Sequence, residues 1–87
     1  MEITLKFFAK AKDLTGTAET KFHVKQSNSL TVGSFLQQVH SKFPRLRELN
    51  NEVILAHNLE FVELNPTSPF NIRSGDEIAF LPPVSGG

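Results

Sequence analysis

The chain has 87 residues, and its nine Lys and Arg residues balance nine Asp and Glu residues. This length allows a single domain with one hydrophobic core. A core of that kind is well supplied, because 39% of the residues are hydrophobic and eight of them are Phe. The balanced charge gives no long-range positive field, which argues against nucleic acid and anionic membranes as partners.

The sequence contains no cysteine. Disulfides, thiolate metal sites and cysteine chemistry on the chain itself are therefore excluded. The first residues lack the basic start and apolar run of a secretory signal, and no segment approaches the ~20 apolar residues of a membrane span. We therefore expect a cytosolic protein.

Residues 2–8 begin with an alternation typical of a strand whose one face is buried. Ile3, Leu5 and Phe7 share one face, and the polar residues between them share the other. Phe8 breaks this pattern by placing an aromatic ring on the polar side. It indicates either a second packing surface or a contact for a partner.

Residues 9–16 predict a short helical turn that Gly16 closes, and residues 20–25 predict a second strand with Phe22 and Val24 inward. The main helix should begin at Thr31, a good N-cap, and end before Pro44. Its apolar residues recur at steps of three and four, as expected for a helix that covers a sheet: Val32, Phe35, Leu36, Val39 and Phe43.

After a loose turn over residues 45–51, residues 52–64 predict a hairpin that turns near His57 and Asn58. The last strand is expected at residues 77–81, after the turn Ser74-Gly75-Asp76. The order of elements indicates an α+β domain over residues 1–81, in which one main helix packs across a mixed sheet of about five strands.

The usual signatures of pocket chemistry are missing. The glycines match no phosphate-binding loop, and no serine lies in a nucleophile-elbow sequence. His23, His40 and His57 fall on separate predicted elements at no metal-like spacing. We therefore expect no bound metal, nucleotide or other cofactor on this chain.

Residues 82–87 predict an extended tail. Pro82 and Pro83 lack amide hydrogens, so they end the sheet ladder and favour a polyproline-like path away from the body. Gly86 and Gly87 have no side chain and suit a narrow channel on another protein. Val84 is then an apolar anchor, and Ser85 a hydrogen-bonding spacer.

The stretch "SGDEIAFLPPVSGG" closely resembles the carboxyl end of the small, sulfur-carrying subunit of molybdopterin synthase. The segments "ITLKFFAKAKDLTG", "LTVGSFLQQV" and "VILAHNLEFVE" resemble the same family, so the similarity covers essentially the whole chain. The resemblance implies a ubiquitin-like β-grasp fold, which agrees with the order of elements inferred above.

The resemblance also implies a chemical cycle centred on Gly87. An adenylating enzyme of the ubiquitin-activating type uses ATP and magnesium to form an acyl-adenylate there, and a sulfur donor converts it to a thiocarboxylate. The sulfur then attacks cyclic pyranopterin monophosphate in the large subunit, and two such transfers build the molybdopterin dithiolene. The chain would thus be the non-catalytic, sulfur-donating subunit of a heterotetramer with two large subunits at its centre.

Such a cycle needs a surface on the body of the domain that binds the large subunit reversibly. The candidates are Phe8, Phe80 and Leu81, which flank the exit of the tail or stand on faces that the core does not need. Phe80 shares parity with Ile78, and this favours a place in the core instead.

Three other functions remain open. A sulfur carrier for thiazole or transfer-RNA thiolation would also end in Gly-Gly, although Pro-Pro-Val-Ser argues against it. A ubiquitin-like modifier would join Gly87 to lysines of target proteins. In a plain interaction module the tail would have no role.

Overall fold

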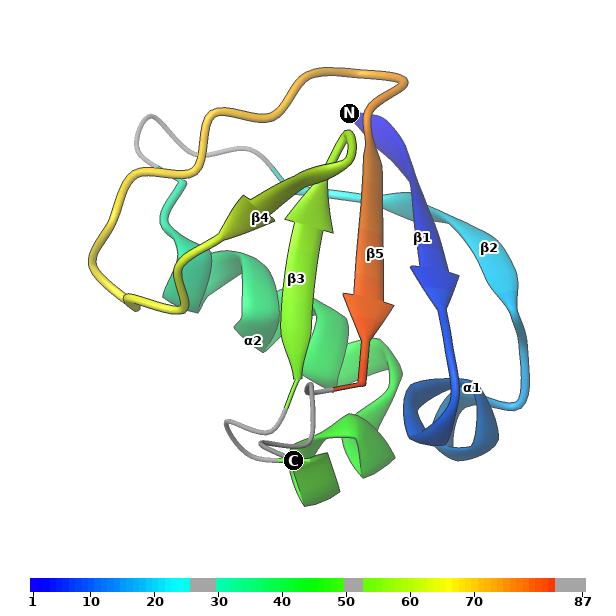
Figure 1. The fold of residues 1–87 in the computed structure, drawn as a ribbon. Coiled ribbons are helices and arrows are strands. Elements are labelled where there is room, and N and C mark those ends of the chain that lie inside the picture. Colours follow the sequence, from blue (N-terminus) through cyan, green and yellow to red (C-terminus); the bar gives the residue numbers. More distant parts are fainter. Residues whose placement is uncertain (26–29, 50–52, 83–87) are drawn as a thin grey trace.

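The computed structural model describes residues 1–25, 30–49 and 53–82 (Figure 1). The elements follow in the order β1 (Glu2–Phe7), α1 (Lys10–Thr15), β2 (Glu19–His23), α2 (Val32–Lys42), the 3₁₀ helix η1 (Pro44–Leu49), β3 (Ile54–His57), β4 (Glu60–Val62) and β5 (Glu77–Leu81).

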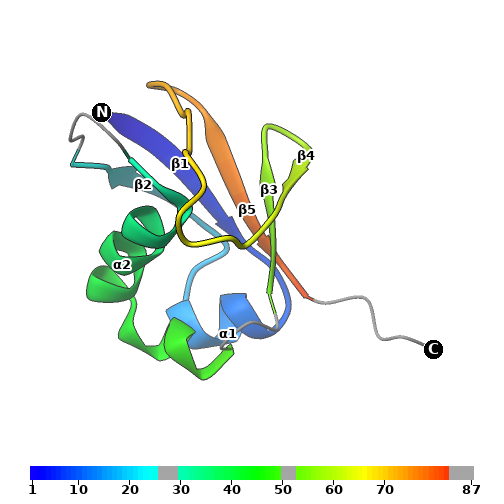
Figure 2. The ribbon, with the colours of Figure 1, turned by 90° about the vertical axis from the view of Figure 1, so that its left-hand side faces the viewer.

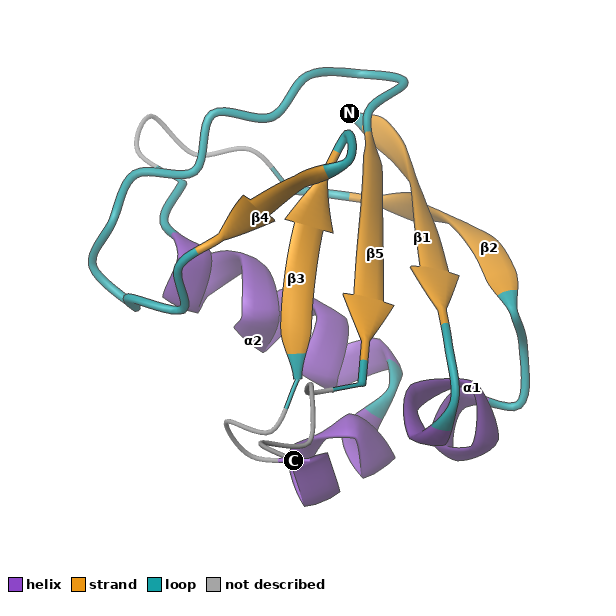
Figure 3. Ribbon diagram, viewed as in Figure 1, coloured by secondary structure: helices purple, strands orange, loops and turns teal. Residues whose placement is uncertain are grey.

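The strands form one mixed sheet in the order β2-β1-β5-β3-β4. The two central strands, β1 and β5, are parallel and come from opposite ends of the described chain, whereas the other pairs are antiparallel. Helix α2 lies across one face of this sheet, and no helix in the described ranges covers the other face (Figures 2 and 3). This is the ubiquitin-like β-grasp arrangement, as predicted.

The core lies between α2 and the covered face of the sheet. The alternation predicted for β1 is confirmed, since Ile3, Leu5 and Phe7 are buried. Because Leu5 pairs with Ile78 and Phe7 with Phe80, the inward residues of β5 join the same layer. The largest fully buried side chains are Phe7, Phe35, Phe80, Ile3, Leu5, Leu55, Ile78, Val24, Val32 and Val39.

Helix α2 begins as predicted, at Thr31. The Thr31 hydroxyl accepts a hydrogen bond from the Ser34 amide at 3.1 Å, and the Ser34 hydroxyl accepts one from the Thr31 amide at 2.9 Å. This reciprocal capping box satisfies donors that the first turn leaves open. The Gly33 amide donates to the Pro66 carbonyl, and a Cβ on Gly33 would lie 2.9 Å from that oxygen, so the close approach requires glycine.

Two local predictions need correction or extension. Residues 45–49, predicted as part of a loose turn, belong to the helix η1, whose Leu46 and Leu49 are buried. Pro44 occupies its first position, where the missing amide hydrogen is not needed. The predicted β3–β4 hairpin is confirmed, but both central residues of its turn, Asn58 and Leu59, have positive φ, at 49° and 73°.

Candidate functional site

The predicted tail leaves the domain at the carboxyl end of β5. Leu81, the last residue of this strand, pairs with Ile54 on β3, and the exposed Pro82 follows it. Because proline has no amide hydrogen, it cannot extend the ladder. The remaining predicted tail residues lie outside the described residues: Pro83, Val84, Ser85, Gly86 and Gly87.

The three residues predicted to form the body interface lie in different environments. Phe8 is 44% exposed, and Leu81 is partly exposed. Phe80, in contrast, is 1% exposed, and its ring centroid lies 5.3 Å from that of Phe7 inside the core. Its proposed place in the interface is therefore wrong, and the core position favoured by its parity with Ile78 is confirmed.

Strand register brings Phe8 and Leu81 together on the open face of the sheet. Phe7 pairs with Phe80 in the parallel β1–β5 ladder, so the next position places Phe8 beside Leu81. The Phe8 amide also donates to the Phe80 carbonyl at 3.1 Å, which ties the end of β1 to β5. Ile54, the partner of Leu81, extends this apolar row onto β3.

Phe61 adds a second aromatic ring to this face. It is 79% exposed on β4 and pairs with Ala56, which in turn pairs with Ala79. Both alanines are buried, so they form a shallow apolar floor between Phe61 and β1. We call Phe8, Ile54, Phe61 and Leu81 the exit patch, because they lie on this open face and Leu81 immediately precedes the tail.

Sequence reasoning missed Phe61 because the apolar run from Leu59 to Val62 shows no clean alternation. Only the register with β3 shows that Phe61 faces outward while Val62, which pairs with Leu55, faces the core. The sequence nonetheless contained a signal that could have identified Phe61 as outward-facing. Once a hairpin with a turn at Asn58 is assumed, the parity of β4 follows from that of β3.

A hollow of about 430 Å³ lies beside Phe8, between the end of β1, α1 and the start of β2. Lys6, Lys12 and Glu19 contribute its charged groups. The Lys6 ammonium lies 3.0 Å from the Glu77 carboxylate, and this hydrogen bond raises the pKa of Lys6. Lys12 brings a second positive charge close to the exit patch.

The opposite end of β5 is polar. The Asp76 carboxylate lies 2.7 Å from Nε2 of His57 and accepts a hydrogen bond from the Arg73 amide at 2.9 Å. Chiefly because of the His57 contact, and then the Arg73 amide, the pKa of Asp76 falls from 3.8 to about 2. His57 also packs edge-to-face on Phe70, so this pair is a structural contact of the fold.

Residues 1–25, 30–49 and 53–82 contain no cluster of three or more His, Asp or Glu side chains suited to a metal ion. In the same ranges, no helix has the length and apolar character needed to cross a bilayer.

Comparison with known proteins assigns the family. The ThiS family model matches residues 5–87, and the chain therefore belongs to the ThiS family. The molybdopterin synthase sulfur carrier subunit of Aedes aegypti is 37% identical over 89 residues, which cover 100% of this chain and 90% of that protein. The resemblance drawn from the sequence is thus confirmed.

Solved structures share the fold over the whole chain. SAMP1, small archaeal modifier protein 1 of Haloferax volcanii, is 27% identical with a TM-score of 0.72 and covers 100% of both chains. A protein–protein complex of subunits 1 and 2 of the molybdopterin-converting factor from Helicobacter pylori contains a chain that is 23% identical, with a TM-score of 0.63 and full coverage of both chains.

Proposed function

We propose that this chain is the sulfur carrier subunit of a molybdopterin synthase and that it acts in the cytosol through the carboxyl group of Gly87. One observation carries the proposal: β5 delivers the exposed Pro82 directly beside the exit patch. A tail that starts there extends from a surface suited to a partner. The name and coverage of the Aedes aegypti relative support the same function.

In the proposed chemistry, the Gly87 carboxylate is first activated, because a free carboxylate reacts poorly with nucleophiles. The Gly87 carboxylate attacks the α-phosphorus of ATP on an activating enzyme and releases pyrophosphate, which leaves an acyl-adenylate. Hydrosulfide, supplied by a sulfur donor at the sulfide oxidation level, then forms a C–S bond at the glycyl carbon and displaces AMP. The product is a thiocarboxylate, whose ionised sulfur is a stronger nucleophile toward carbon than the original carboxylate oxygen.

The second half of the proposed cycle takes place in the large subunit. The sulfur attacks an oxygen-bearing carbon of cyclic pyranopterin monophosphate, and that carbon–oxygen bond breaks, with the oxygen leaving as a phosphate ester or as water. A second water molecule then cleaves the bond between sulfur and the glycyl carbonyl. This hydrolysis returns the Gly87 carboxylate and leaves the sulfur on the pterin. Two rounds supply the two sulfur atoms of the dithiolene, with the acids and bases provided by the large subunit.

The exit patch is the surface that we assign to the large subunit. An exposed apolar cluster with aromatic rings at its edges is typical of a protein interface. Lys6, Glu77 and Glu19 form a charged rim beside it, suited to orienting the partner without adding apolar area. The complex of two converting-factor subunits in Helicobacter pylori supports such an interface, which we expect in a heterotetramer of two small and two large subunits.

The decisive experiment combines the full chain with an activating enzyme, ATP, magnesium and a sulfur donor. Intact mass spectrometry should show one oxygen replaced by one sulfur, and the product should convert cyclic pyranopterin monophosphate when the large subunit is added. Deletion of Gly86 and Gly87 should abolish both results while circular dichroism and binding to the large subunit are kept. Unchanged conversion by the truncated chain would exclude the proposal.

A second candidate function is protein modification, which the similarity to SAMP1 favours. A modifier would form an amide between Gly87 and target lysines. Mass spectrometry of trypsin-digested cell extracts would then find lysines of many proteins branched with residues 74–87, since Arg73 is the last tryptic site, whereas a dedicated sulfur carrier should give few such adducts. Sulfur carriers for thiazole or transfer-RNA thiolation would be separated by the acceptor that takes up the sulfur.

A further inference from the structure

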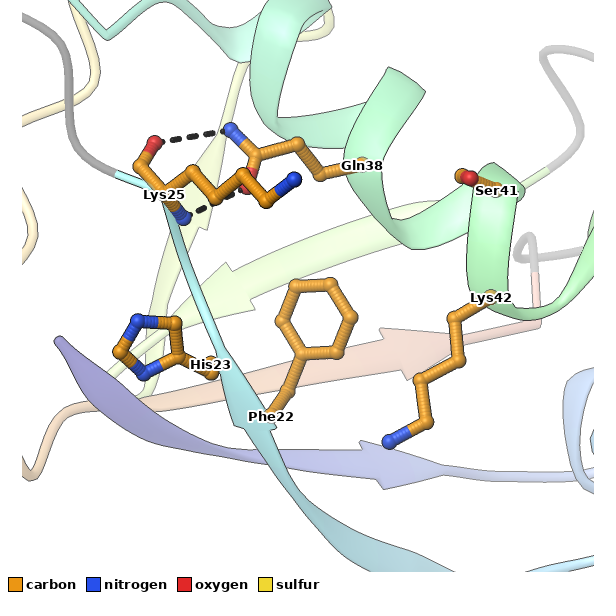
Figure 4. A pocket seen from close by; sticks show the side chains of 6 residues that line it. All are labelled: Phe22, His23, Lys25, Gln38, Ser41 and Lys42. Atoms are coloured by element: carbon orange, nitrogen blue, oxygen red, sulfur yellow. Dashed lines mark hydrogen bonds between the residues drawn. The ribbon is translucent and has the colours of Figure 1, made fainter.

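A second surface lies away from the exit patch, between β2 and the last turns of α2. Figure 4 shows this groove, whose volume is about 250 Å³. It is lined by Phe22, His23, Lys25, Gln38, Ser41 and Lys42. Since β1 separates β2 from β5 in the sheet, this groove can be filled while the tail and the exit patch are engaged elsewhere.

The strand side of the groove is an edge of the sheet. β2 pairs only with β1 among the described strands. The Val24 amide donates to the Met1 carbonyl at 2.8 Å, and the Met1 amine donates to the Val24 carbonyl at 3.2 Å. Backbone groups alternate along an antiparallel strand, so those of Lys21 and His23 point outward.

Side chains close this edge at both ends. The Gln38 amide group accepts a hydrogen bond from the Lys25 amide at 2.8 Å and donates one to the Lys25 carbonyl at 3.0 Å (Figure 4). The Thr17 hydroxyl similarly donates to the Glu19 carbonyl at 2.9 Å. The open stretch is therefore Lys21–His23. Among the described residues, the one hydrogen bond to an outward backbone group there is an exposed bond from the Thr20 hydroxyl to the Lys21 carbonyl.

The groove is positively charged. In Figure 4 the ammonium groups of Lys25 and Lys42 lie on opposite sides of the Phe22 ring. Lys42 Nζ lies 5.7 Å from the centroids of both Phe22 and Phe43, which fixes it by cation–π contacts. Neither ammonium forms an ion pair within the described residues, and the groove has no acidic lining residue there.

We propose that this groove binds an extended acidic segment of a partner protein. The segment pairs its backbone with the outward groups of Lys21 and His23 and places carboxylates near Lys25 and Lys42. Edge strands are templates for an added strand, and main-chain bonds supply affinity while side chains supply specificity. The ammonium groups of Lys25 and Lys42 select acidic residues at alternate positions, which lie on one face of a strand roughly 7 Å apart.

The test follows amide chemical shifts of the isotopically labelled full chain during titration with the acetylated and amidated peptide VEVDV. Shifts should be confined to β2 and the end of α2, saturate at about 0.1–1 mM as for a short, weakly bound peptide, and decrease with salt. The neutral peptide VQVNV and inorganic phosphate serve as ligand controls. Equal binding of the neutral peptide, or the same shifts with phosphate, would overturn the proposal.

Variants separate the charge from the strand pairing. Lys25→Glu with Lys42→Glu should weaken VEVDV binding at least about tenfold, whereas the matched reversal Lys10→Glu with Arg73→Glu should leave it unchanged. His23→Pro removes one outward amide without touching the β1 ladder and should abolish binding, whereas His23→Ala should retain it. Unchanged binding by a charge-reversed or proline variant whose remaining spectrum is native would refute the inference.

Peptide binding at the groove is independent of the proposed sulfur chemistry. The shift measurements use an unloaded chain and no large subunit, so a failed peptide titration leaves the carrier function intact. Conversely, an inactive tail would leave the groove and its ligand unaffected.

Discussion

The two ends of β5 differ in the contacts that their side chains make within the domain. At its start, Asp76 is held by His57 and the Arg73 amide, and Asn58 accepts a hydrogen bond from the Glu77 amide at 2.8 Å. At its end, Leu81 belongs to the exit patch, whose aromatic residues Phe8 and Phe61 are exposed to solvent.

This contrast separates stability from binding within one short strand. A polar group that finds its partners inside the fold contributes to stability and needs nothing further. An exposed aromatic ring gains free energy only when another surface covers it. Substitutions at the start of β5 should therefore change the free energy of unfolding, whereas those in the exit patch should change affinity for a partner.

The largest expected change in the free energy of unfolding comes from Phe80, a core residue between the two ends of β5. Phe80→Ala should lower the free energy of unfolding by about 3–5 kcal/mol, because it removes a fully buried ring that packs on Phe7. Phe8→Ala should lower it by less than about 1 kcal/mol. Urea denaturation followed by circular dichroism measures both, and equal losses would contradict the assignment of Phe8 to the surface.

Phe61→Ser tests whether the exit patch serves binding and not stability. It should weaken binding to the large subunit roughly thirtyfold, as expected for an aromatic anchor of an interface, with little change in unfolding. Leu59→Ser is the matched control, because Leu59 is 88% exposed on the same hairpin but lies in the turn, outside the exit patch. Calorimetric titration would disprove the patch if both variants bound equally well.

Asp76→Asn addresses the polar end. The variant should be less stable by about 1–2 kcal/mol near neutral pH, because it removes the charged acceptor from His57 and Arg73. Since the pKa of Asp76 is about 2 when folded and near 3.8 when free, its contribution is complete above about pH 4–5 and is lost as pH falls through 2.

Thermal unfolding at a series of pH values between 7 and 2 measures this effect. The stability difference between wild type and Asp76→Asn should shrink as pH falls through that window. Asp13→Asn on α1 is the control and should give a nearly constant difference. Parallel curves for wild type and Asp76→Asn would show that the carboxylate contacts add nothing.

The smallest expected effect concerns Ala9, next to the exit patch. Its φ of 51° and ψ of −123° are costly for a residue with a Cβ. Ala9→Gly should therefore raise the unfolding free energy by about 0.5–1 kcal/mol, whereas Ala11→Gly, in the buried face of α1, should lower it. Denaturation curves that move in the same direction for both variants would contradict strain at Ala9.

Much of the fold was predictable because its signals are local. The alternation in β1, the cap at Thr31 and the break at Pro44 each depend on a few neighbouring residues, and each is confirmed. The helix η1 was not predicted, because its sequence has no caps and is too short for a clear period.

The site was predicted less completely because it depends on pairing across the sheet. Phe8 was identified by its own break in parity, but Phe61 required the β3–β4 register, and Phe80 could be placed only by its parity with Ile78. The groove beside β2 was not anticipated at all. It depends on Gln38 and Lys42 of α2 meeting a strand far from them in the sequence.

The central position of β5 links display of the tail to completion of the domain. β5 is inserted between β1 and β3, so the two halves of the sheet cannot be joined until residues 77–81 have been synthesised and paired. A partly made or misfolded chain lacks both the exit patch and the strand that directs Pro82 outward. If the chain has the proposed function, an activating enzyme that recognises both features would load only fully folded molecules, so sulfur would not be attached to incomplete chains.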